Sequence, residues 1–190
     1  MSRSGNGILS ALVDAAVAIV RALAGSQARG SAGVGSRSAP AATGRETPSE
    51  QAPGTETVEV DPQTIGRLDL AYSPRRDGDP DAGEVIWTWV PYAERDGRGK
   101  DRPVLVIARQ GAERVYAVKL TSKSHDQDRD YLSIGTGPWD GQGRESWVDI
   151  DQLYSVHRRG MRREAAALDR SRYERVAAVL QRRYGWGRAA

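Results

Sequence analysis

The sequence predicts a small, mainly β domain that ends in one helix (an α+β fold), preceded by a largely disordered extension. Within residues 83–187, five or six short segments rich in β-branched and aromatic residues alternate with turns that contain Gly or Pro. One segment with helical spacing of apolar residues follows them. Short strands separated by turns, with a single helix at the end, indicate a small β-barrel that carries a C-terminal helix.

The N-terminal part of the chain offers little material for a core. Residues 1–24 predict a short amphipathic helix, because four apolar residues share one helical face: Ile8, Leu12, Ile19 and Leu23. Asp14 interrupts this apolar stretch, which argues against a secretory signal. Residues 25–82 are predicted to be a disordered linker, since their Gly-, Ala-, Ser- and Pro-rich first part cannot bury enough surface to offset chain entropy. Four larger apolar residues later in this linker suit a short docked element: Ile65, Leu68, Leu70 and Tyr72.

Six strands are expected in the compact domain, at residues 84–90, 103–108, 114–120, 131–134, 146–150 and 153–157. The first is β-branched and aromatic, and it ends at Pro91. The second is a continuous apolar run, suited to the middle of a sheet. The third alternates in polarity after a turn at Gly111, so the second and third strands should form a hairpin. The remaining three are short and follow polar or glycine-rich loops.

One helix is predicted after residue 169. Asp169 and Ser171 both have side chains suited to capping its N-terminus. Five apolar residues then recur at helical spacing and define the face that should pack on the barrel: Tyr173, Val176, Ala177, Leu180 and Tyr184. Gly185 is expected to end the helix.

Composition excludes several classes of protein and site. The chain has no Cys and two His, so it can form no disulfide, no thiol nucleophile and no cysteine-based zinc site, and no metal site is predicted. No apolar run approaches the roughly 20 residues that a membrane-spanning helix needs.

Positive charge is concentrated near the C-terminus, although the formal net charge is only +3. Residues 158–188 contain ten Arg against Glu164, Asp169 and Glu174. An anionic partner such as nucleic acid would explain this concentration, and so would a solvated, arginine-rich helix. Composition alone leaves both explanations open.

Polar residues stand at the ends of the two strands that should form the hairpin. Arg102 comes directly before the second strand, and Thr121 follows the third, so antiparallel pairing should make them neighbours. A guanidinium beside hydroxyl groups suits a phosphate-like anion, because Arg can donate two parallel hydrogen bonds. A structural alternative is that Arg102 pairs with a nearby carboxylate and Thr121 closes the turn. The residues by themselves favour neither explanation.

Four motifs occur in an order and spacing that resemble the MazF/PemK family of toxin endoribonucleases of type II toxin–antitoxin pairs. They are residues 83–87 (GEVIW), 101–107 (DRPVLVI), 120–123 (LTSK) and 151–156 (DQLYSV). The resemblance covers about residues 83–185. It implies an SH3-like small β-barrel of the MazF/PemK (CcdB-like) type that forms a homodimer, needs no cofactor and works in the cytoplasm.

The resemblance also implies an activity and partners. The substrate would be single-stranded RNA, cleaved sequence-specifically and without metal by attack of a ribose 2′-hydroxyl, which leaves 2′,3′-cyclic phosphate and 5′-hydroxyl ends. A cognate antitoxin would block the site, and the antitoxin complex would bring the toxin to DNA. A rival hypothesis is a non-catalytic SH3-like module that binds nucleic acid or protein and has lost the nuclease chemistry.

Site residues follow from the matched motifs. The family's Arg before Pro corresponds to Arg102, which would stabilise charge on the phosphoryl oxygens. Its Thr corresponds to Thr121, which with Ser122 would hold a phosphoryl oxygen or the nucleophile. Its Asp before Gln corresponds to Asp151, which would transfer protons; His125, which lies in the loop after the third strand and outside the matched motifs, is the alternative.

RNA contacts are expected around the same end of the domain. The polar loop after the first strand contributes Tyr92, Arg95, Arg98 and Lys100, and the loop after the third strand contributes Ser122 and Lys123. Trp89 would either stack on an unpaired base or belong to the core.

Overall fold

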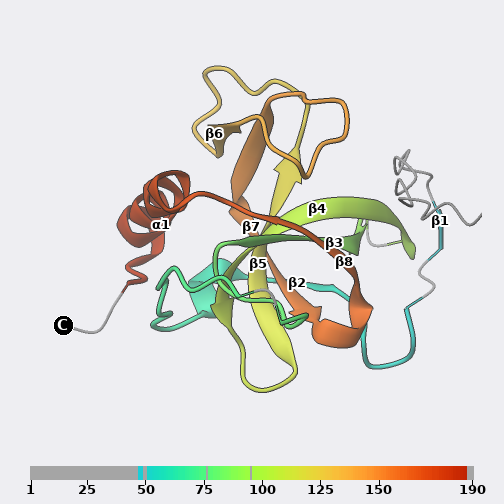
Figure 1. The fold of residues 1–190 in the computed structure, drawn as a ribbon. Coiled ribbons are helices and arrows are strands. Elements are labelled where there is room, and N and C mark those ends of the chain that lie inside the picture. Colours follow the sequence, from blue (N-terminus) through green and yellow to red (C-terminus); the bar gives the residue numbers. More distant parts are fainter. Residues whose placement is uncertain (1–46, 49–50, 76, 95, 188–190) are drawn as a thin grey trace, which may run out of the picture. The chain divides into compact units, whose positions relative to one another are not determined.

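The computed structural model describes residues 47–48, 51–75, 77–94 and 96–187. These residues contain eight strands, one α-helix and two 3-10 turns (Figure 1). The strands are β1 (Thr47–Pro48), β2 (Val58–Val60), β3 (Glu84–Pro91), β4 (Arg98–Arg109), β5 (Arg114–Thr121), β6 (Tyr131–Gly135), β7 (Ser146–His157) and β8 (Met161–Ala167). The helix is α1 (Arg170–Tyr184), and the 3-10 turns are η1 (Pro62–Thr64) and η2 (Arg158–Gly160). The helix expected in residues 1–24 and the linker residues 25–46 lie outside the described part of the chain.

All eight strands belong to one antiparallel sheet, with the order β2-β7-β5-β4-β3-β8 and with β1 on β4 and β6 on β7. The predicted mainly β domain with a C-terminal helix is therefore confirmed. The sheet is open and not a closed barrel, because the end strands β2 and β8 do not pair with each other within the described residues. Side chains bridge part of the opening, where the hydroxyl oxygens of Thr57, just before β2, and Thr88, on β3, lie 2.9 Å apart.

Each face of the curved sheet carries its own apolar cluster. Helix α1 covers one face (Figure 1), where its buried residues Tyr173, Val176 and Leu180 join apolar side chains of the strands. The other face holds a smaller cluster: Ile86, Val90, Val104, Val106, Val115, Ala117, Tyr154 and Val156. We call these the helix face and the opposite face. In the described part of the chain, no helix is long and apolar enough to cross a membrane.

The ends of α1 confirm the capping signals in the sequence. Asp169 is the N-cap, and its carboxylate accepts the backbone N–H of Arg172 at 3.0 Å. The second candidate, Ser171, instead donates its hydroxyl to Asp169 at 2.6 Å. Gly185 ends the helix in the left-handed conformation with φ of 74°, where a residue without Cβ is favoured.

The prediction of a disordered linker is wrong for residues 51–75 and 77–82, whereas the short docked element expected at Ile65, Leu68, Leu70 and Tyr72 is confirmed. Strand β2 pairs with residues 153–155 of β7, and Leu68 and Leu70 are buried in the cluster on the helix face. The guanidinium of Arg114 donates to the carbonyl of Glu56 at 2.6 Å and so fixes the residues before β2. Composition suggested disorder because this segment adds few apolar side chains; main-chain pairing and polar contacts hold much of it instead.

Three further elements differ from the sequence-based expectation. β4 begins at Arg98 rather than at residue 103, so much of the predicted polar loop continues the strand. The two expected strands at 146–150 and 153–157 are one strand, β7. β8 was not expected at all, because its sequence (MRREAAA) lacks the β-branched residues typical of strands; pairing with β3 determines its conformation.

Leu180→Ala tests the packing of α1. Leu180 is fully buried, so we expect its truncation to lower the free energy of unfolding by about 2–5 kcal/mol, as cavity-forming Leu substitutions do. Urea denaturation followed by circular dichroism measures this change. Arg182→Ala, an exposed substitution on the same helix, is the control, and an equal loss in both variants would show that this face of α1 is not buried.

Candidate active site

The strand register places Arg102 among polar groups at one end of the sheet. On one side, Arg102 lies opposite Thr88 of β3. On the other, Val104 of β4 lies opposite Lys119 of β5, and extending this register by two residues brings Arg102 level with Thr121. Because side chains alternate along strands, Arg102, Lys119 and Thr121 all point to the opposite face, the one that α1 does not cover.

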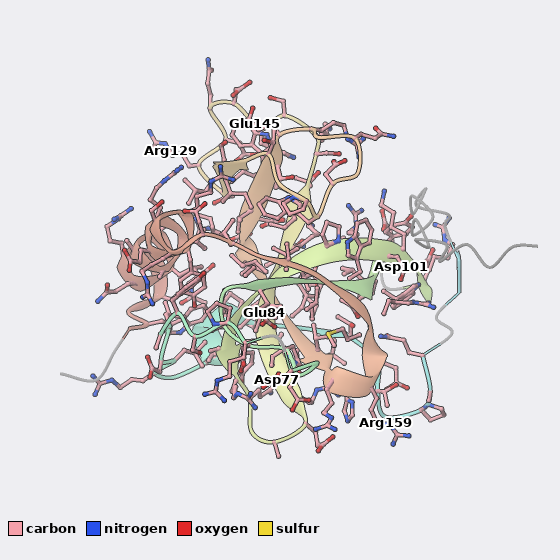
Figure 2. All side chains as sticks on the ribbon, in the orientation of Figure 1. Asp77, Glu84, Asp101, Arg129, Glu145 and Arg159 are labelled. Atoms are coloured by element: carbon pink, nitrogen blue, oxygen red, sulfur yellow. The ribbon has the colours of Figure 1, made fainter. Side chains whose placement is uncertain are left out.

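Within the described residues, the side chain of Arg102 makes no hydrogen bond or ion pair. It is half-buried, whereas its neighbour Asp101 is held by Arg162 of β8 with an N–O distance of 3.1 Å (Figure 2 labels Asp101). The charge of Arg102 nevertheless acts on two phenols, since it opposes the rise in the pKa of both Tyr131 and Tyr154. A half-buried guanidinium without a carboxylate partner is available to an anionic ligand.

A nearly buried ion pair lies beside this guanidinium. The ammonium of Lys119 is 3.1 Å from a carboxylate oxygen of Asp149, and the two side chains are 16% and 5% exposed. Lys119 also donates to the side-chain oxygen of Gln152 at 2.5 Å. The other carboxylate oxygen of Asp149 accepts the backbone N–H groups of Asp151 at 3.0 Å and Gln152 at 3.3 Å.

This ion pair occupies an irregularity in the sheet. Val118 of β5 faces Leu153 of β7 and Leu120 faces Val148, so the single residue Lys119 stands against residues 149–152. Such a bulge leaves backbone donors without ladder partners. Asp149 accepts two of them, and the carbonyl of Asp130 accepts a third, from Ile150, at 2.8 Å.

Two phenols complete the polar group. Tyr154 donates its hydroxyl to Gln152 at 3.0 Å, and burial, followed by the charge of Glu59, raises the pKa of Tyr154. Burial, followed by the charge of Asp149, raises the pKa of Tyr131 to about 12. Both phenols therefore remain protonated near neutral pH.

The loop after β5 places a histidine against one of these phenols. The rings of His125 and Tyr131 stack with centroids 3.5 Å apart and an angle of 10° between their planes. His125 Nδ1 is 3.4 Å from a carboxylate oxygen of Asp128. At the start of this loop, the hydroxyl of Thr121 accepts the backbone N–H of Lys123 at 3.2 Å.

Asp151 does not join this group. Its carboxylate accepts a hydrogen bond at 2.6 Å from Arg183 of α1, and the same guanidinium donates to Asp130 at 2.6 Å. The hydrogen bond that Arg183 donates to Asp130 is the main cause that raises the pKa of Arg183 above its ordinary value. Asp151 thus ties α1 to β7, while Asp149 is the carboxylate beside Lys119.

Comparison with known proteins now identifies the family. Residues 81–183, more than half of the chain, match the family model described as PemK-like, MazF-like toxin of type II toxin–antitoxin system. The chain belongs to this family. The resemblance in the motifs around Arg102, Thr121 and Asp151 is thereby confirmed at the level of the family.

Solved structures of MazF proteins are similar to this member of the PemK/MazF family. A MazE–MazF crystal structure from Deinococcus radiodurans has 21% identity and a TM-score of 0.44, covering 57% of this chain and 98% of that one. A mycobacterial endoribonuclease in complex with its cognate antitoxin has 16% identity and a TM-score of 0.43, covering 56% and 95%. The Mycobacterium tuberculosis toxin MazF-mt6 has 14% identity and a TM-score of 0.41, covering 55% and 99%. Comparison with curated protein sequences found no match.

The expected RNA contacts of this PemK/MazF member have different surroundings. Trp89 is 5% exposed, and its ring lies directly against Gly99, so stacking on a base is not supported and Trp89 belongs to the packed sheet. Tyr92, Arg98 and Lys100 lie where β3 passes into β4, and Arg98 forms a 2.6 Å ion pair with Asp96. Arg95 lies outside the described residues.

Sequence reasoning missed most of the polar network. The residues concerned share the face of Arg102: Glu59, Lys119, Tyr131, Asp149, Gln152 and Tyr154. Lys119 gave a signal, because it is the one charged residue inside the otherwise uncharged segment 115–121. No signal in the sequence distinguishes Asp149 from Asp151. The two residues are two positions apart in the same strand, and only the bulge gives them different surroundings.

The arginines of α1 are largely used within the domain. Arg172 donates to the carbonyl of Thr136 at 2.7 Å and Arg175 to that of Ser133 at 2.8 Å, so both hold α1 against β6 and the residues after it. With Arg183 on Asp130 and Asp151, and Arg170 at 3.7 Å from Glu174, four arginines of α1 have internal partners. This geometry favours the structural explanation of the arginine-rich helix over a nucleic-acid surface.

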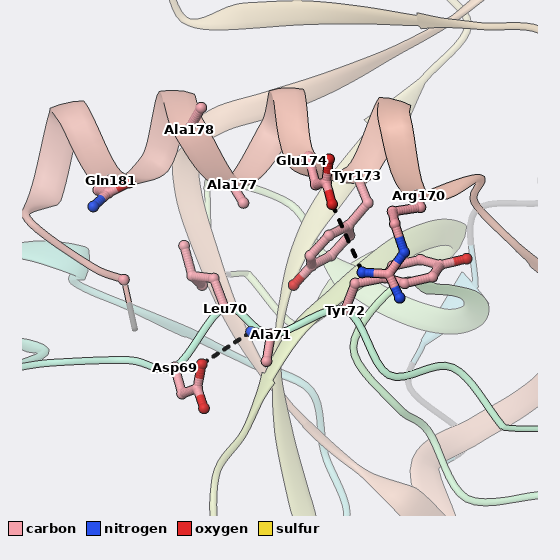
Figure 3. Close-up of a pocket in the computed structure, with 11 residues that line it drawn as sticks. Asp69, Leu70, Ala71, Tyr72, Arg170, Tyr173, Glu174, Ala177, Ala178 and Gln181 are labelled. Carbon is pink, nitrogen blue, oxygen red and sulfur yellow. Dashed lines mark hydrogen bonds and ion pairs between the residues drawn. The ribbon is translucent and has the colours of Figure 1, made fainter. Parts of the chain in front are cut away.

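A cavity of about 390 Å³ lies between α1 and residues 69–72 (Figure 3). Tyr173 and Ala177 line it on the helix side, and Leu70 and Tyr72 line it opposite. None of the predicted site residues borders this cavity, so it is not the site around Arg102. Among the described residues, no cluster of His, Asp and Glu could hold a metal ion.

Lys119→Met tests the ion pair. Removing the ammonium leaves Asp149 buried without its charge partner, which should lower the free energy of unfolding by about 3–5 kcal/mol. The double variant Lys119→Met/Asp149→Asn removes both charges and keeps an oxygen for the two backbone N–H groups, so it should recover most of the loss. Urea unfolding of both variants measures this, and a double variant no more stable than Lys119→Met would contradict the assignment.

Proposed function

We propose that this chain is the RNA-cleaving toxin of a type II toxin–antitoxin pair, and that Arg102 stabilises the transition state. The observation that carries the proposal is the half-buried guanidinium of Arg102, which has no hydrogen-bond or ion-pair partner among the described residues. It stands level with Thr121 and beside protonated phenols and Lys119. A binding module could use the same cation for phosphate, so the cleavage assay below separates the two hypotheses.

The proposed reaction is a transesterification within single-stranded RNA. The 2′-oxygen attacks the adjacent phosphorus, the bond from phosphorus to the 5′-oxygen breaks, and a 2′,3′-cyclic phosphate forms. The 2′-hydroxyl proton passes to a base on the protein, and the departing 5′-oxygen takes up a proton and becomes a hydroxyl. Arg102 would bind the phosphoryl oxygens as their negative charge grows, and Thr121 and Ser122 would hold an oxygen of the same phosphate.

The proton-transfer role fits His125 better than Asp151. His125 stacks on Tyr131, whose hydroxyl feels the charge of Arg102, and Asp128 lies beside its Nδ1 atom. Asp151 is bound by Arg183, on the side of the domain that α1 covers. An imidazole oriented by a carboxylate is a common arrangement for general acid–base catalysis.

The RNA strand would run between the two loops that flank Arg102. Tyr92, Arg98 and Lys100 border this end of the sheet on one side, and Ser122 and Lys123 border it on the other. These residues would bind the backbone in a positively charged groove, without metal or cofactor.

The family description also supports partners. A type II toxin is controlled by a protein antitoxin, so we propose a cognate antitoxin that covers the Arg102 site and brings the complex to DNA. We further propose that the toxin works as a homodimer in the cytoplasm, where its RNA substrate is found.

Arg102→Ala tests the catalytic role. Loss of one preorganised charge donor should slow cleavage of a mixed single-stranded RNA pool by about 10²-fold or more. Binding should weaken less, because only interactions that strengthen in the transition state accelerate the reaction. Arg159→Ala, at the exposed turn η2 (Figure 2), is the matched control and should cleave like the wild type.

The same cleavage assay separates the enzyme from the binding module. Cleavage should persist in EDTA, and the 5′ ends should accept phosphate from polynucleotide kinase without prior phosphatase treatment. A wild-type protein that binds but never cuts RNA, with Arg102→Ala only weakening binding, would leave the binding module as the function.

His125→Ala and Asp151→Asn distinguish the two proton-transfer candidates. If His125 transfers the proton, His125→Ala should slow cleavage by about 10²–10⁴-fold. Asp151→Asn should mainly lower thermal stability, because it weakens the contact with Arg183. The reverse pattern, with cleavage lost in Asp151→Asn at unchanged stability, would assign the role to Asp151.

A further inference from the structure

A segment outside the family-matched residues reaches the candidate active site. Residues 51–60, which we call the strap, include β2. They lie before the family-matched region, which begins at residue 81. Glu59 of β2 pairs with Tyr154 of β7, so their side chains lie on the same face of the sheet. This is the face without α1, defined above as the opposite face, and the side chain of Arg102 lies on it too.

The strap is firmly held. Arg114 donates to the carbonyls of Gly54 and Glu56, at 3.4 and 2.6 Å. Gln51 donates to the carbonyl of Gly160 at 3.1 Å and accepts the backbone N–H of Thr57 at 2.9 Å. With β2 paired in the sheet and the residues before it anchored, the strap presents Glu59 in a fixed position.

Glu59 is connected to the polar network by Gln152. The amide nitrogen of Gln152 is 3.4 Å from a carboxylate oxygen of Glu59. The amide oxygen of Gln152 accepts from both Lys119 and Tyr154, and since each of these donates, the orientation of the amide is settled. Gln152 therefore presents N–H groups beside the carboxylate of Glu59. Both Glu59 and Arg102 act on the hydroxyl of Tyr154: the charge of Glu59 raises its pKa and that of Arg102 lowers it.

The chemistry of this pair suits a base and not a phosphate. A carboxylate repels phosphate and, when ionised, can only accept hydrogen bonds, from N–H or O–H groups. On its Watson–Crick edge, guanine alone presents two adjacent N–H donors, at N1 and N2, which match the two oxygens of a carboxylate. The neighbouring O6 is an acceptor for an amide N–H such as that of Gln152. Unpaired bases in single-stranded RNA expose this edge to protein side chains.

We propose that Glu59, with Gln152 beside it, selects a guanine next to the phosphate that Arg102 binds. The strap thereby gives this PemK/MazF domain a specificity residue from outside the family-matched region. This inference rests on the proposed RNA cleavage, but it concerns which RNA is cut and not how.

Glu59→Gln tests the inference through the pattern of cleavage. A random single-stranded RNA pool is cut with wild-type protein and each variant, and the cleaved ends are mapped. Wild-type protein should show guanine enriched at one position next to the cut, and Glu59→Gln should reduce that enrichment about tenfold or more, the scale of one lost two-point base contact. Glu56→Gln, the same charge change three residues earlier in the strap, is the matched control and should keep the wild-type pattern.

A substrate change provides the second measurement. Inosine lacks the N2 amino group, so placing it at the selected position should slow cleavage by wild-type protein and have little further effect on Glu59→Gln. Full, Arg102-dependent cleavage by wild-type protein without guanine enrichment, or with enrichment unchanged in Glu59→Gln, would overturn the inference and leave the nuclease intact. A wild-type protein that cuts no RNA would overturn the proposed function and this inference with it.

Discussion

The carboxylate of Asp149 is the contact on which the continuity of the sheet and the arrangement of the site both depend. Between two regular stretches of pairing, β7 carries four residues where β5 carries one. An excursion of this size would leave backbone N–H groups unpaired in a partly buried place, at a cost of up to about 1–3 kcal/mol each. Asp149 accepts two of them with one oxygen and binds Lys119 with the other. The bulge, the buried charge and the buried ammonium therefore stabilise one another.

This arrangement also divides the polar residues of β7 between the two faces of the sheet. Asp149 and Gln152 serve the face of Arg102, whereas Asp151 turns to Arg183 and the helix. An ordinary alternating strand would send Asp149 and Asp151 to the same face. The bulge breaks that alternation, so two acidic residues two positions apart have different partners and different candidate roles. The C-terminal arginines Arg172 and Arg175 secure α1 over the helix face, and Arg102 is a cation that has no hydrogen-bond or ion-pair partner in the described part of the chain.

The sequence correctly predicted those strands and the helix whose own residues determine their secondary structure. The apolar run at 103–108 is a strand and the segment from Asp169 to Gly185 is a capped helix, as expected. The apolar pattern and the capping residues that predict them lie within the segments themselves. β2 was missed because it has only three residues within a largely polar segment, and β8 because it lacks β-branched residues; both depend on the strand beside them. For the site, the hairpin register made Arg102 and Thr121 neighbours, but the network of Lys119, Asp149 and Gln152 could not be seen, since it depends on an irregular register that no periodicity reveals.

The strap shows why an open sheet can still protect its second cluster. The opening of the sheet lies between β2 and β8, and Gln51, Thr57 and Thr88 bridge part of it with side-chain hydrogen bonds. Gly160 is shaped for this contact: a Cβ there would lie 2.4 Å from the carbonyl oxygen of Thr55 and 2.6 Å from the amide nitrogen of Gln51. A residue within the family-matched region thus fits a segment outside it, and any side chain at position 160 would push the strap away. β2 directly follows the residues that contact Gly160, so displacement of the strap would also move Glu59 away from Gln152. The same packing therefore covers the open side of the sheet and fixes the carboxylate that we propose reads the base.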